Sequence, residues 1–332
     1  MGERLLTRAL RANLWVLGNS LSQICSSVIR SNRRELVLRR TSYLCGCVVS
    51  ILLLSSGGTL AEGKEPSVPT LRFSAIPDQD ETRLREKFGP VAEYLSRTLG
   101  VPVEYVHATK YSDSVDLFKN GDIQLAWFGG LTGVQARHAV KGARAIAQGA
   151  EDPEFYSYFI AHKDAGIEPS LEFPKAIAGK RLTFGSMGST SGRLMPEFFI
   201  RENTGKSPRD FLGAISFSGS HDRTVELVES GQFDVGVLNY QVYDRRVAEG
   251  KTDPAVVEVI WKTPVYPDYN FTAHPDLESM YAAGFTDKVQ RALVAMEDAD
   301  LLSAFPRSAL IPAENSDFDA IHELALKLDF IR

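Results

Sequence analysis

The stretch TFGSMGSTSGRLMPEFF, from Thr183 to Phe199, decides how the fold is interpreted. It begins as an apolar strand, passes through Gly-Ser-Thr-Ser-Gly, and ends in a pattern typical of a helix. The first N–H groups of a helix lack partners within it, and the helix dipole adds partial positive charge there. An anion satisfies both, provided that side chains leave its approach open. The stretch therefore predicts an anion-binding helix N-terminus. The alternative is an ordinary N-cap with a flexible lead-in.

The residue types in this loop favour anion binding over other loop functions. Glycines let the backbone turn and approach a ligand, and hydroxyl groups donate hydrogen bonds without adding charge: Gly185, Gly188, Gly192, Ser189, Thr190 and Ser191. Pro196 lacks an N–H group, so the helix behind the loop is expected to bend or to start late. A Walker phosphate loop needs Lys before its Ser or Thr, and this loop has none.

The rest of the chain alternates apolar strands with amphipathic helices, which predicts α/β architecture with a mostly parallel sheet. The order also recurs. YSDSVDLFKNGDIQLAW (111–127) aligns with HDRTVELVESGQFDVGV (221–237), so that Val115 meets Val225 and Gly121 meets Gly231. The pattern predicts two similar α/β lobes, and its alternative is a chance match between generic α/β segments. In open parallel sheets, ligands bind beyond the carboxyl ends of strands, where helices begin.

The composition divides the chain into two regions. The first 61 residues contain eight Arg, two Glu and all three cysteines (Cys25, Cys45 and Cys47). Of the 37 basic and 42 acidic residues in the chain, 29 and 40 lie beyond Ala61, so this body has a net charge of −11. Negative charge argues against nucleic acid as a partner, and a body without cysteine cannot be stabilised by disulfides.

The first region has the residue order of a secretory signal. NRRELVLRR (32–40) is basic, YLCGCVVSILLL (43–54) is apolar, and small residues precede Glu62. We therefore expect residues 1–61 to be a leader that is cleaved after Ala61, and the mature protein to be periplasmic. The alternative is a membrane anchor, although the apolar run is short for a bilayer.

From Thr70 to about Lys327 the chain resembles the phosphonate/phosphite substrate-binding proteins of ABC importers. The resemblance rests on four segments: GSTSG (188–192), YSDSVDLFKNGDIQLAWFGG (111–130), EDPEFYSYFIAHKD (151–164) and WKTPVYPDYNF (261–271). Within that family, IPDQDETRLREKF and WFGGLTGVQAR are most similar to a branch labelled selenate-binding. The resemblance implies a type II periplasmic-binding-protein fold, with two α/β lobes around a ligand cleft joined by two crossovers.

The lobe boundaries expected from this resemblance are 62–165 for the first part of lobe 1, 166–264 for lobe 2, and 265–332 for the return to lobe 1. The first crossover is expected in AHKDAGIEP (161–169) and the second in WKTPVYP (261–267). Prolines and glycines near both segments suit hinges that absorb lobe closure.

The resemblance also implies a set of ligand contacts. The hydroxyl run Ser189, Thr190 and Ser191 holds the oxyanion, and Tyr111 donates a hydroxyl from the other lobe. His221 occupies the repeat-equivalent position in the second lobe, although an ordinary loop histidine is the alternative. Asp268 matches a family acid that accepts a proton from the ligand, and its alternative is a turn aspartate after a proline.

Two further groups of residues are weaker candidates. Tyr156 is expected to give another hydroxyl contact, a role that Tyr158 could take instead. Trp127, Phe128 and Gly129 are expected to form an apolar wall of the site, and plain core packing is the alternative for them.

These observations predict a binding protein and no enzyme. The six histidines have no metal-ligand spacing, so we expect no metal and no cofactor. The expected function is delivery of a small oxyanion (phosphonate, phosphite, selenate or selenite) by a monomeric protein to the membrane permease of an ABC importer. The alternatives are a ligand-sensing input protein for a signalling partner and an enzyme acting on a phosphorylated or oxyanion substrate.

Overall fold

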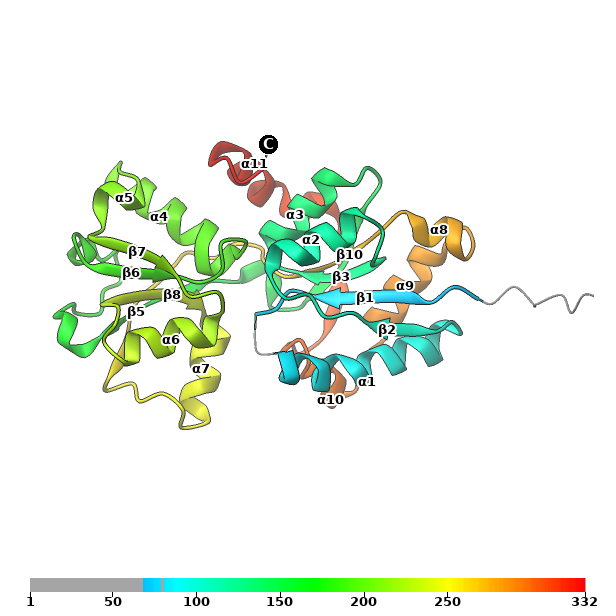
Figure 1. Cartoon of the computed structure of the whole chain (residues 1–332), viewed down its shortest axis with the longest axis horizontal. Helices are drawn as coiled ribbons and strands as arrows, with labels where there is room; N and C mark the ends of the chain where they lie inside the picture. Colours follow the sequence, from blue (N-terminus) through cyan, green and yellow to red (C-terminus); the bar gives the residue numbers. More distant parts are fainter. Residues whose placement is uncertain (1–67, 79–80, 332) are drawn as a thin grey trace, which may run out of the picture. The chain divides into compact units, whose positions relative to one another are not determined.

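The structure is a computed structural model that describes residues 68–78 and 81–331 (Figure 1). The leader expected at residues 1–61 lies outside the described residues. Within the described ranges, none of the helices is long and apolar enough to cross a bilayer.

The first lobe is built on a six-stranded sheet with the order β11-β4-β10-β3-β1-β2. Its strands are β1 (Leu71–Ala75), β2 (Val103–Tyr105), β3 (Leu125–Phe128), β4 (Arg144–Gly149), β10 (Asn270–Ala273) and β11 (Leu310–Pro312). Strand β1 pairs in parallel with β2 and β3, whereas β10 runs antiparallel to both β3 and β4. The sheet is therefore mixed.

The second lobe repeats this arrangement in a five-stranded sheet with the order β7-β6-β8-β5-β9. Its strands are β5 (Ser157–His162), β6 (Arg181–Phe184), β7 (Ala214–Phe217), β8 (Val235–Asn239) and β9 (Val257–Lys262). Here β5 runs antiparallel to β8 and β9 and occupies the place that β10 has in the first sheet. The expected mostly parallel sheets are instead mixed. Strands β10 and β5 each follow a crossing between the lobes and run antiparallel to both of their neighbours, and β11 also runs antiparallel to β4.

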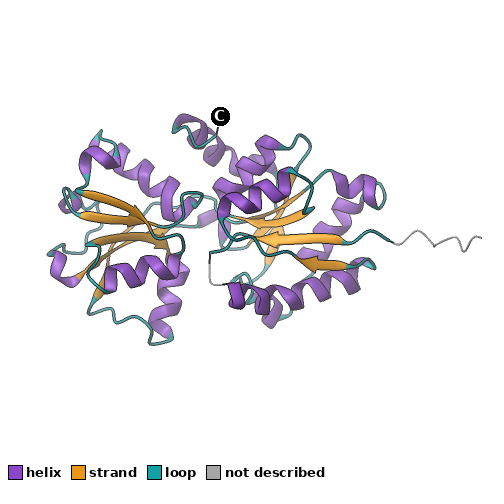
Figure 2. Ribbon diagram, in the orientation of Figure 1, coloured by secondary structure: helices purple, strands orange, loops and turns teal. Residues whose placement is uncertain are grey.

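Helices cover both faces of each sheet (Figure 2). The main ones are α1 (Glu81–Leu99), α2 (Tyr111–Lys119), α3 (Gly130–Ala139), α4 (Met195–Thr204), α6 (His221–Glu229), α7 (Tyr240–Ala248), α9 (Phe285–Val294) and α11 (Asp319–Lys327). Short helices are α5 (Pro208–Phe211), α8 (Asp276–Met280) and α10 (Ala299–Leu302). Helix α1 stops before Gly100, whose φ of 69° suits the left-handed end of a helix.

Helices α2 and α6 have equal lengths and begin at equivalent positions of the repeat, Tyr111 and His221. Each leads to a strand at the centre of its sheet, β3 or β8. The repeat inferred from the sequence is thus a structural repeat. The two-lobe α/β fold is confirmed.

The chain crosses between the sheets twice. The first crossing lies at 150–156, since β4 belongs to the first sheet and β5 to the second. This is earlier than the expected segment 161–169, so the strand 157–162 belongs to the second lobe and not to the first. The second crossing lies at 263–269 and overlaps the expected segment. The two crossing segments are joined by backbone hydrogen bonds, including Asp268 N–H to the Asp152 carbonyl at 3.1 Å.

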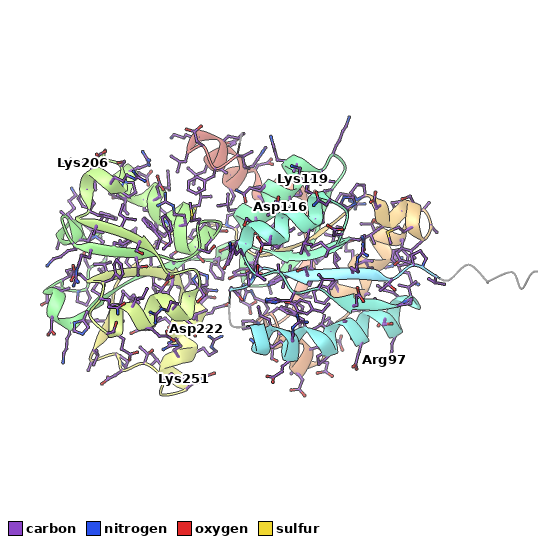
Figure 3. The ribbon with its side chains drawn as sticks, in the orientation of Figure 1. Arg97, Asp116, Lys119, Lys206, Asp222 and Lys251 are labelled. Atoms are coloured by element: carbon purple, nitrogen blue, oxygen red, sulfur yellow. The ribbon has the colours of Figure 1, made fainter. Side chains whose placement is uncertain are left out.

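Exposed charged side chains cover the lobes, and apolar residues fill their cores. Arg97, Lys119 and Lys206 point away from the ribbon in Figure 3, whereas Phe73, Phe128 and other strand residues are fully buried. This separation is the usual result of removing apolar surface from water.

Candidate functional site

The small-residue loop starts an irregular helix. Residues Thr190–Leu194 form one π-helical turn, which continues into α4 at Met195. Pro196 has no N–H to donate to the carbonyl of Gly192, four residues earlier. That carbonyl instead accepts the Gly185 N–H, at 2.8 Å. The late start of the regular helix, expected from Pro196, is confirmed, and the freed carbonyl ties the loop to the end of β6.

Close approach explains why glycine is needed at two positions of the loop. A Cβ on Gly192 would lie 3.0 Å from Ser189 Oγ, 3.1 Å from Gly185 Cα and 3.2 Å from His221 Cε1. A Cβ on Gly188 would lie 3.0 Å from Tyr111 Cβ, in the other lobe. The loop therefore lies against residues of both lobes, and there is no room for a side chain at Gly188 or Gly192.

The three hydroxyl residues of the loop are buried, with 1–2% of their surfaces exposed. Ser189 is the N-cap, and its Oγ accepts the Gly192 N–H at 3.0 Å. Thr190 Oγ1 accepts the Leu131 N–H at 3.0 Å. The Ser191 carbonyl accepts the Ser157 hydroxyl at 2.7 Å.

His221 lies against the loop as a neutral donor. Its Nδ1 accepts the backbone N–H of Asn239 at 3.3 Å, which places the ring proton on Nε2. Burial lowers the pKa of His221 to about 4, so the imidazole is uncharged near neutral pH. Its Nε2 is buried and has no hydrogen-bond partner. The ring therefore holds an N–H donor that is ready for a ligand.

Tyr111 offers a second buried donor from the first lobe. Its hydroxyl has no hydrogen-bond partner of standard geometry. Burial raises the pKa of Tyr111 well above its usual value, with further contributions from the charges of Asp78 and Asp268, while the nearby Ser189 side chain lowers it. The hydroxyl therefore stays protonated and lies among the loop and two carboxyl groups.

Asp268 contributes a buried carboxyl group beside the loop. Its Oδ1 accepts the Gly130 N–H at 2.8 Å, and its side chain is 1% exposed. Burial raises the pKa of Asp268 to about 7, while the Gly130 N–H and the Thr190 hydroxyl oppose this shift. The group is thus poised to gain or lose a proton near neutral pH. We call the six residues Tyr111, Ser189, Thr190, Ser191, His221 and Asp268 the polar cage.

The three residues expected to form an apolar wall have different positions. Trp127 is 3% exposed and stacks on Tyr269, with ring centroids 5.5 Å apart. Phe128 points into the core of the first lobe, against Phe118. Gly129 lies at the polar cage, since a Cβ there would be 3.3 Å from both Asp268 Oδ1 and Thr190 Oγ1. Only Trp127 fits the expected wall, because successive strand residues face opposite sides of the sheet.

Tyr156 and Tyr158 face away from the loop. Ser157, between them, bonds to the loop, so its neighbours project to the other face of the strand. Tyr156 stacks on Tyr240 with centroids 3.8 Å apart, and its ring lies under the ammonium group of Lys262. The structure therefore does not support either tyrosine as a ligand contact.

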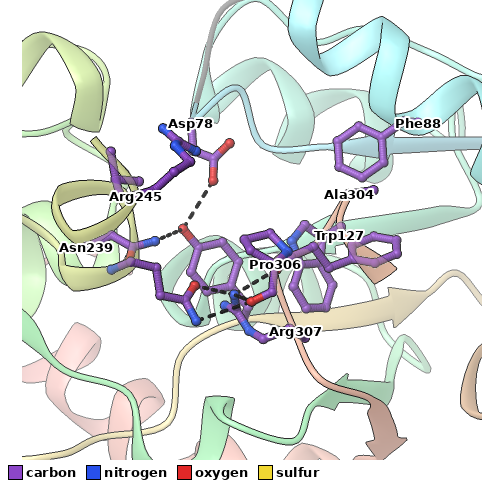
Figure 4. Close-up of a pocket in the computed structure, with 12 residues that line it drawn as sticks. Asp78, Phe88, Trp127, Asn239, Arg245, Ala304, Pro306 and Arg307 are labelled. Carbon is purple, nitrogen blue, oxygen red and sulfur yellow. Dashed lines mark hydrogen bonds between the residues drawn. The ribbon is translucent and has the colours of Figure 1, made fainter. Parts of the chain in front are cut away.

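A cavity of about 110 Å³ was not foreseen from the sequence (Figure 4). None of the six polar-cage residues lines it, but its lining residue Asn239 donates its backbone N–H to His221 of the cage. It is lined by aromatic and polar side chains that include Asp78, Trp127, Asn239, Tyr269, Phe305 and Arg307. The Tyr269 hydroxyl accepts from Asn239 Nδ2 at 3.1 Å and donates to Asp78 Oδ2 at 3.3 Å. These contacts join the first lobe, the second crossing and the second lobe at the wall of the cavity.

The floor of this cavity holds a buried ion pair. Arg307 Nη2 lies 2.6 Å from Asp152 Oδ1, and both side chains are at most 1% exposed. The same guanidinium donates to Gln241 of the second lobe and lies 4.8 Å from the centre of the Tyr269 ring. Arg307 was missed in the sequence because its partner lies 155 residues away. Arg307 follows Pro306 in a loop, so neither a helix or strand periodicity nor a motif in the sequence singled it out.

The polar cage has the chemistry of an anion site. It combines neutral O–H and N–H donors with one carboxyl group of raised pKa, and none of its residues is Lys or Arg. Arg193, which follows the loop, packs over the rings of Phe184 and Phe217 and pairs with Glu197. Among the residues that the structure describes, no group of His, Cys, Asp and Glu is arranged to hold a metal ion.

Comparisons with known proteins agree with this chemistry. Residues 73–318 match the family described as "ABC transporter, phosphonate, periplasmic substrate-binding protein". The chain is 37% identical over 270 residues to the probable ABC transporter phosphite binding protein PhnD1 of Prochlorococcus marinus, covering 79% of this chain and 91% of that protein. It is 28% identical over 304 residues to the phosphate-import protein PhnD of Mycolicibacterium smegmatis, covering 84% and 92%.

A solved structure of Prochlorococcus marinus PhnD1 in complex with methylphosphonate has a TM-score of 0.75 and 36% identity, covering 79% of this chain and 99% of that one. Fold, family match and relatives agree with one another. The chain therefore belongs to the periplasmic substrate-binding proteins of phosphonate ABC transporters, with a type II periplasmic-binding-protein fold and a binding role that involves no catalysis.

Proposed function

We propose that the polar cage binds one tetrahedral phosphorus oxyanion, either phosphite or a small phosphonate, and that the protein delivers it to the permease of an ABC importer. The observation that carries this proposal is the pair of buried donors without partners, the Tyr111 hydroxyl and His221 Nε2. They come from equivalent helices of the two lobes. A buried donor left unpaired costs free energy, and an oxyanion between the lobes satisfies both donors at once.

The charge state of Asp268 supports a protonatable anion as the ligand. A carboxylate repels a fully deprotonated dianion, but it accepts a hydrogen bond from a ligand that still carries a proton. Phosphite and phosphonates can carry such a proton near neutral pH, whereas sulfate and selenate cannot. The two relatives described above are named for phosphite and phosphate, and the solved structure of the first is a complex with methylphosphonate. Selenate, to which one branch of the family pointed, is accordingly the less favoured ligand.

The remaining parts of the proposal concern location and partners. Residues 1–61 act as a secretory signal, and the mature protein works in the periplasm as a monomer whose partners are the permease subunits. This rests on the charge and cysteine asymmetry of the sequence. N-terminal sequencing of exported material tests it: a start near Glu62 is expected, and a start well upstream of Tyr43 contradicts it.

Calorimetric titration tests the ligand. Phosphite, methylphosphonate, phosphate, selenite, selenate and sulfate are each titrated into the purified protein near pH 7. We expect binding of phosphite or methylphosphonate, with selenate and sulfate much weaker, and a rise in melting temperature by mass action for the anions that bind. Absence of binding by every anion at millimolar concentration overturns the proposal. Selenate as the tightest ligand overturns the assignment of the anion class.

A further inference from the structure

The proline behind the small-residue loop leaves a loop carbonyl without its helical partner. In the π-helical turn each N–H bonds to the carbonyl five residues earlier, as the Met195 N–H does to Thr190. Pro196 comes next in this register, and it has no N–H to donate to the Ser191 carbonyl. Ser191 is 1% exposed. Its carbonyl therefore needs a donor from outside the helix, because a buried carbonyl without a hydrogen bond costs free energy.

A serine at the start of β5 supplies this donor. Ser157 is fully buried, and its hydroxyl donates to the Ser191 carbonyl at 2.7 Å. The main chain of Ser157 is in turn bonded to the second crossing. Its N–H donates to Thr263 Oγ1 at 2.9 Å, and its carbonyl accepts the Thr263 N–H at 3.0 Å. The donor for the loop is thus held where the two crossing segments meet.

A third hydroxyl bonds to Ser157, and the hydrogen count gives the direction of this bond. A serine hydroxyl has one hydrogen to donate and two lone pairs to accept. The hydrogen of Ser157 goes to a carbonyl, which can only accept. The Tyr266 hydroxyl, 2.5 Å from Ser157 Oγ, is therefore the donor of the second bond. We call this chain of hydrogen bonds, from Tyr266 through Ser157 to Ser191, the hydroxyl relay.

The surroundings of Tyr266 keep the relay intact. Tyr266 is 5% exposed, and its N–H donates to the Phe155 carbonyl of the first crossing at 2.8 Å. Burial raises the pKa of Tyr266 well above its usual value, and the charge of Asp268 raises it further. The phenol therefore keeps its proton for Ser157. A hydroxyl that accepts a hydrogen bond is also a stronger donor in the bond that it makes itself.

We propose that Ser157 and Tyr266 are positioning residues that hold the Ser191 part of the small-residue loop in its anion-binding conformation. The inference rests on the proposed function, because it concerns the loop of the same site. Neither hydroxyl touches the ligand, since the single hydrogen of each is used within the relay. The tyrosines on either side of Ser157 face away from the loop, so the serine is the residue of this segment that acts on the site.

Loss of the relay should act on affinity through the conformation of the loop. An unpaired Ser191 carbonyl favours other loop conformations in which the carbonyl finds a partner. Apparent affinity falls in proportion to the fraction of molecules that keep the binding conformation. Tyr266 acts only through Ser157. Replacing Tyr266 should therefore cause no further loss of affinity once the Ser157 hydroxyl is absent.

The test compares Ser157→Ala, Tyr266→Phe and the double variant with the wild type, and Tyr243→Phe is the matched control. Tyr243 is also a buried tyrosine, but its hydroxyl donates to the Val257 carbonyl of β9, at 2.6 Å, and not to the relay. Calorimetry measures the affinities for phosphite and methylphosphonate. Mass spectrometry measures amide hydrogen exchange of residues 186–195 in the ligand-free protein. Exchange reports local opening without any ligand, so it tests the relay independently of the proposed function.

We expect Ser157→Ala to weaken both anions about tenfold and Tyr266→Phe about threefold. The double variant should bind like Ser157→Ala. Exchange of residues 186–195 should become faster in the same order, by more than any change in α9 of the first lobe. Tyr243→Phe should be less stable but keep the wild-type affinity and loop exchange.

Two results would overturn the proposal. Wild-type affinity and loop exchange in Ser157→Ala would show that the loop does not need the relay. Additive losses of affinity in the double variant would show that Tyr266 acts by a route other than Ser157. If the wild type binds neither anion while loop exchange responds as expected, the proposed function fails and the relay keeps its role in fixing the loop.

Discussion

At the scale of single residues, equivalent positions of the two-lobe repeat carry two different hydrogen-bond donors, Tyr111 and His221. Both begin a helix at equivalent positions of the two lobes, both are buried, and the donor atom of each has no partner. A tyrosine supplies an O–H and a neutral histidine supplies an N–H, so an anion between them meets donors without meeting a cation. Unpaired buried donors cost the protein stability, and an anion bound as proposed would satisfy both of them.

The Tyr111 hydroxyl gives the first prediction. Tyr111→Phe removes one unpaired buried hydroxyl and leaves the ring in place. The ligand-free protein should become more stable by about 1 kcal/mol, while the affinity for phosphite or methylphosphonate falls by at least about tenfold. Tyr243→Phe is the control, because that hydroxyl already donates to the Val257 carbonyl at 2.6 Å and its loss should destabilise the protein. Denaturant unfolding and calorimetry measure both effects. Unchanged affinity of Tyr111→Phe would remove Tyr111 from the site.

Asp268 gives the second prediction, which concerns pH. Its pKa is raised to about 7 by burial, so the native protein holds a proton between about pH 4 and pH 7 that the unfolded chain releases. Stability therefore falls as the pH rises through this window. Ligand affinity should fall as the pH rises through 7, because Asp268 and the ligand then both lose their protons and an ionised carboxylate repels a fully deprotonated anion.

Asp268→Asn should remove both of these pH dependences and weaken the discrimination against sulfate. Asp116→Asn, at an exposed acid on α2 (Figure 3), should change neither. Calorimetry with methylphosphonate and sulfate at pH 6 and pH 8 (about one unit either side of the Asp268 pKa) measures the effect. The same pH slope in wild type and Asp268→Asn would show that Asp268 does not control binding.

At the scale of elements, the small-residue loop leads into a π-helical turn, Thr190–Leu194, whose hydrogen bonding is altered by Pro196. Single π-helical turns often occur at functional sites. Here the turn exists because Pro196 leaves the Gly192 carbonyl without a helical partner, and Gly185 supplies one from the end of β6. The backbone of the loop is thereby fixed by protein contacts before any ligand is bound. Fixed donors lower the entropy that binding must overcome.

Gly192→Ala tests this arrangement. The new Cβ would lie 3.0–3.2 Å from Ser189 Oγ, Gly185 Cα and His221 Cε1, so the loop must shift away from β6 and His221. Affinity should fall by at least about a hundredfold, with a destabilisation of about 1–3 kcal/mol. Gly89→Ala is the matched control. Its Cβ meets nothing within 4 Å in α1, so the protein should gain about 0.5–1 kcal/mol with no change in affinity. Full affinity in Gly192→Ala would mean that the loop tolerates the shift.

At the scale of the whole described chain, Arg307 joins both lobes and one crossing. It pairs with Asp152 of the first crossing and donates to Gln241 of α7. A buried charge pair does not by itself show that a protein gains net stability from the pair. Removing one partner, however, leaves the other charge buried and without a counter-charge, which is strongly destabilising. Replacing only one of the two residues should therefore destabilise the protein more than replacing both.

The prediction for this pair uses three variants. Arg307→Met should lower the free energy of unfolding by about 3–5 kcal/mol because it leaves Asp152 buried and alone. The double variant Asp152→Asn with Arg307→Met should regain part of that loss. Arg223→Met, which breaks an exposed pair with Glu226, should change stability by less than about 1 kcal/mol. Urea unfolding measures all three. An equal loss in the single and double variants would contradict the account.

Much of the fold followed from the sequence for physical reasons. Local signals were sufficient for the small-residue turn before α4 and for the equivalent helix starts at Tyr111 and His221, since small residues and helix starts are encoded by neighbouring positions. That these residues bind an anion stays a prediction. The first crossing was misplaced because the pattern of a strand does not say which sheet it joins. The contacts of Tyr156 with Tyr240 and Lys262 were not foreseen, because one residue of register decides which face a residue beside a strand occupies. Asp78, Tyr269 and Arg307 were missed because their contacts bring together distant parts of the chain.

The place of β10 also determines the order in which the protein can fold as it leaves the ribosome. The five strands of the second sheet come from one continuous segment, 157–262, whereas β10 is inserted between β3 and β4 of the first sheet and begins only at Asn270. The first lobe therefore emerges early but stays incomplete, with a gap in its sheet, until the second lobe has been synthesised. Pairing over such a sequence distance is slow. In the secretion proposed above, the chain has to stay unfolded until it is exported, and this topology delays completion of the first sheet until β10 has been synthesised.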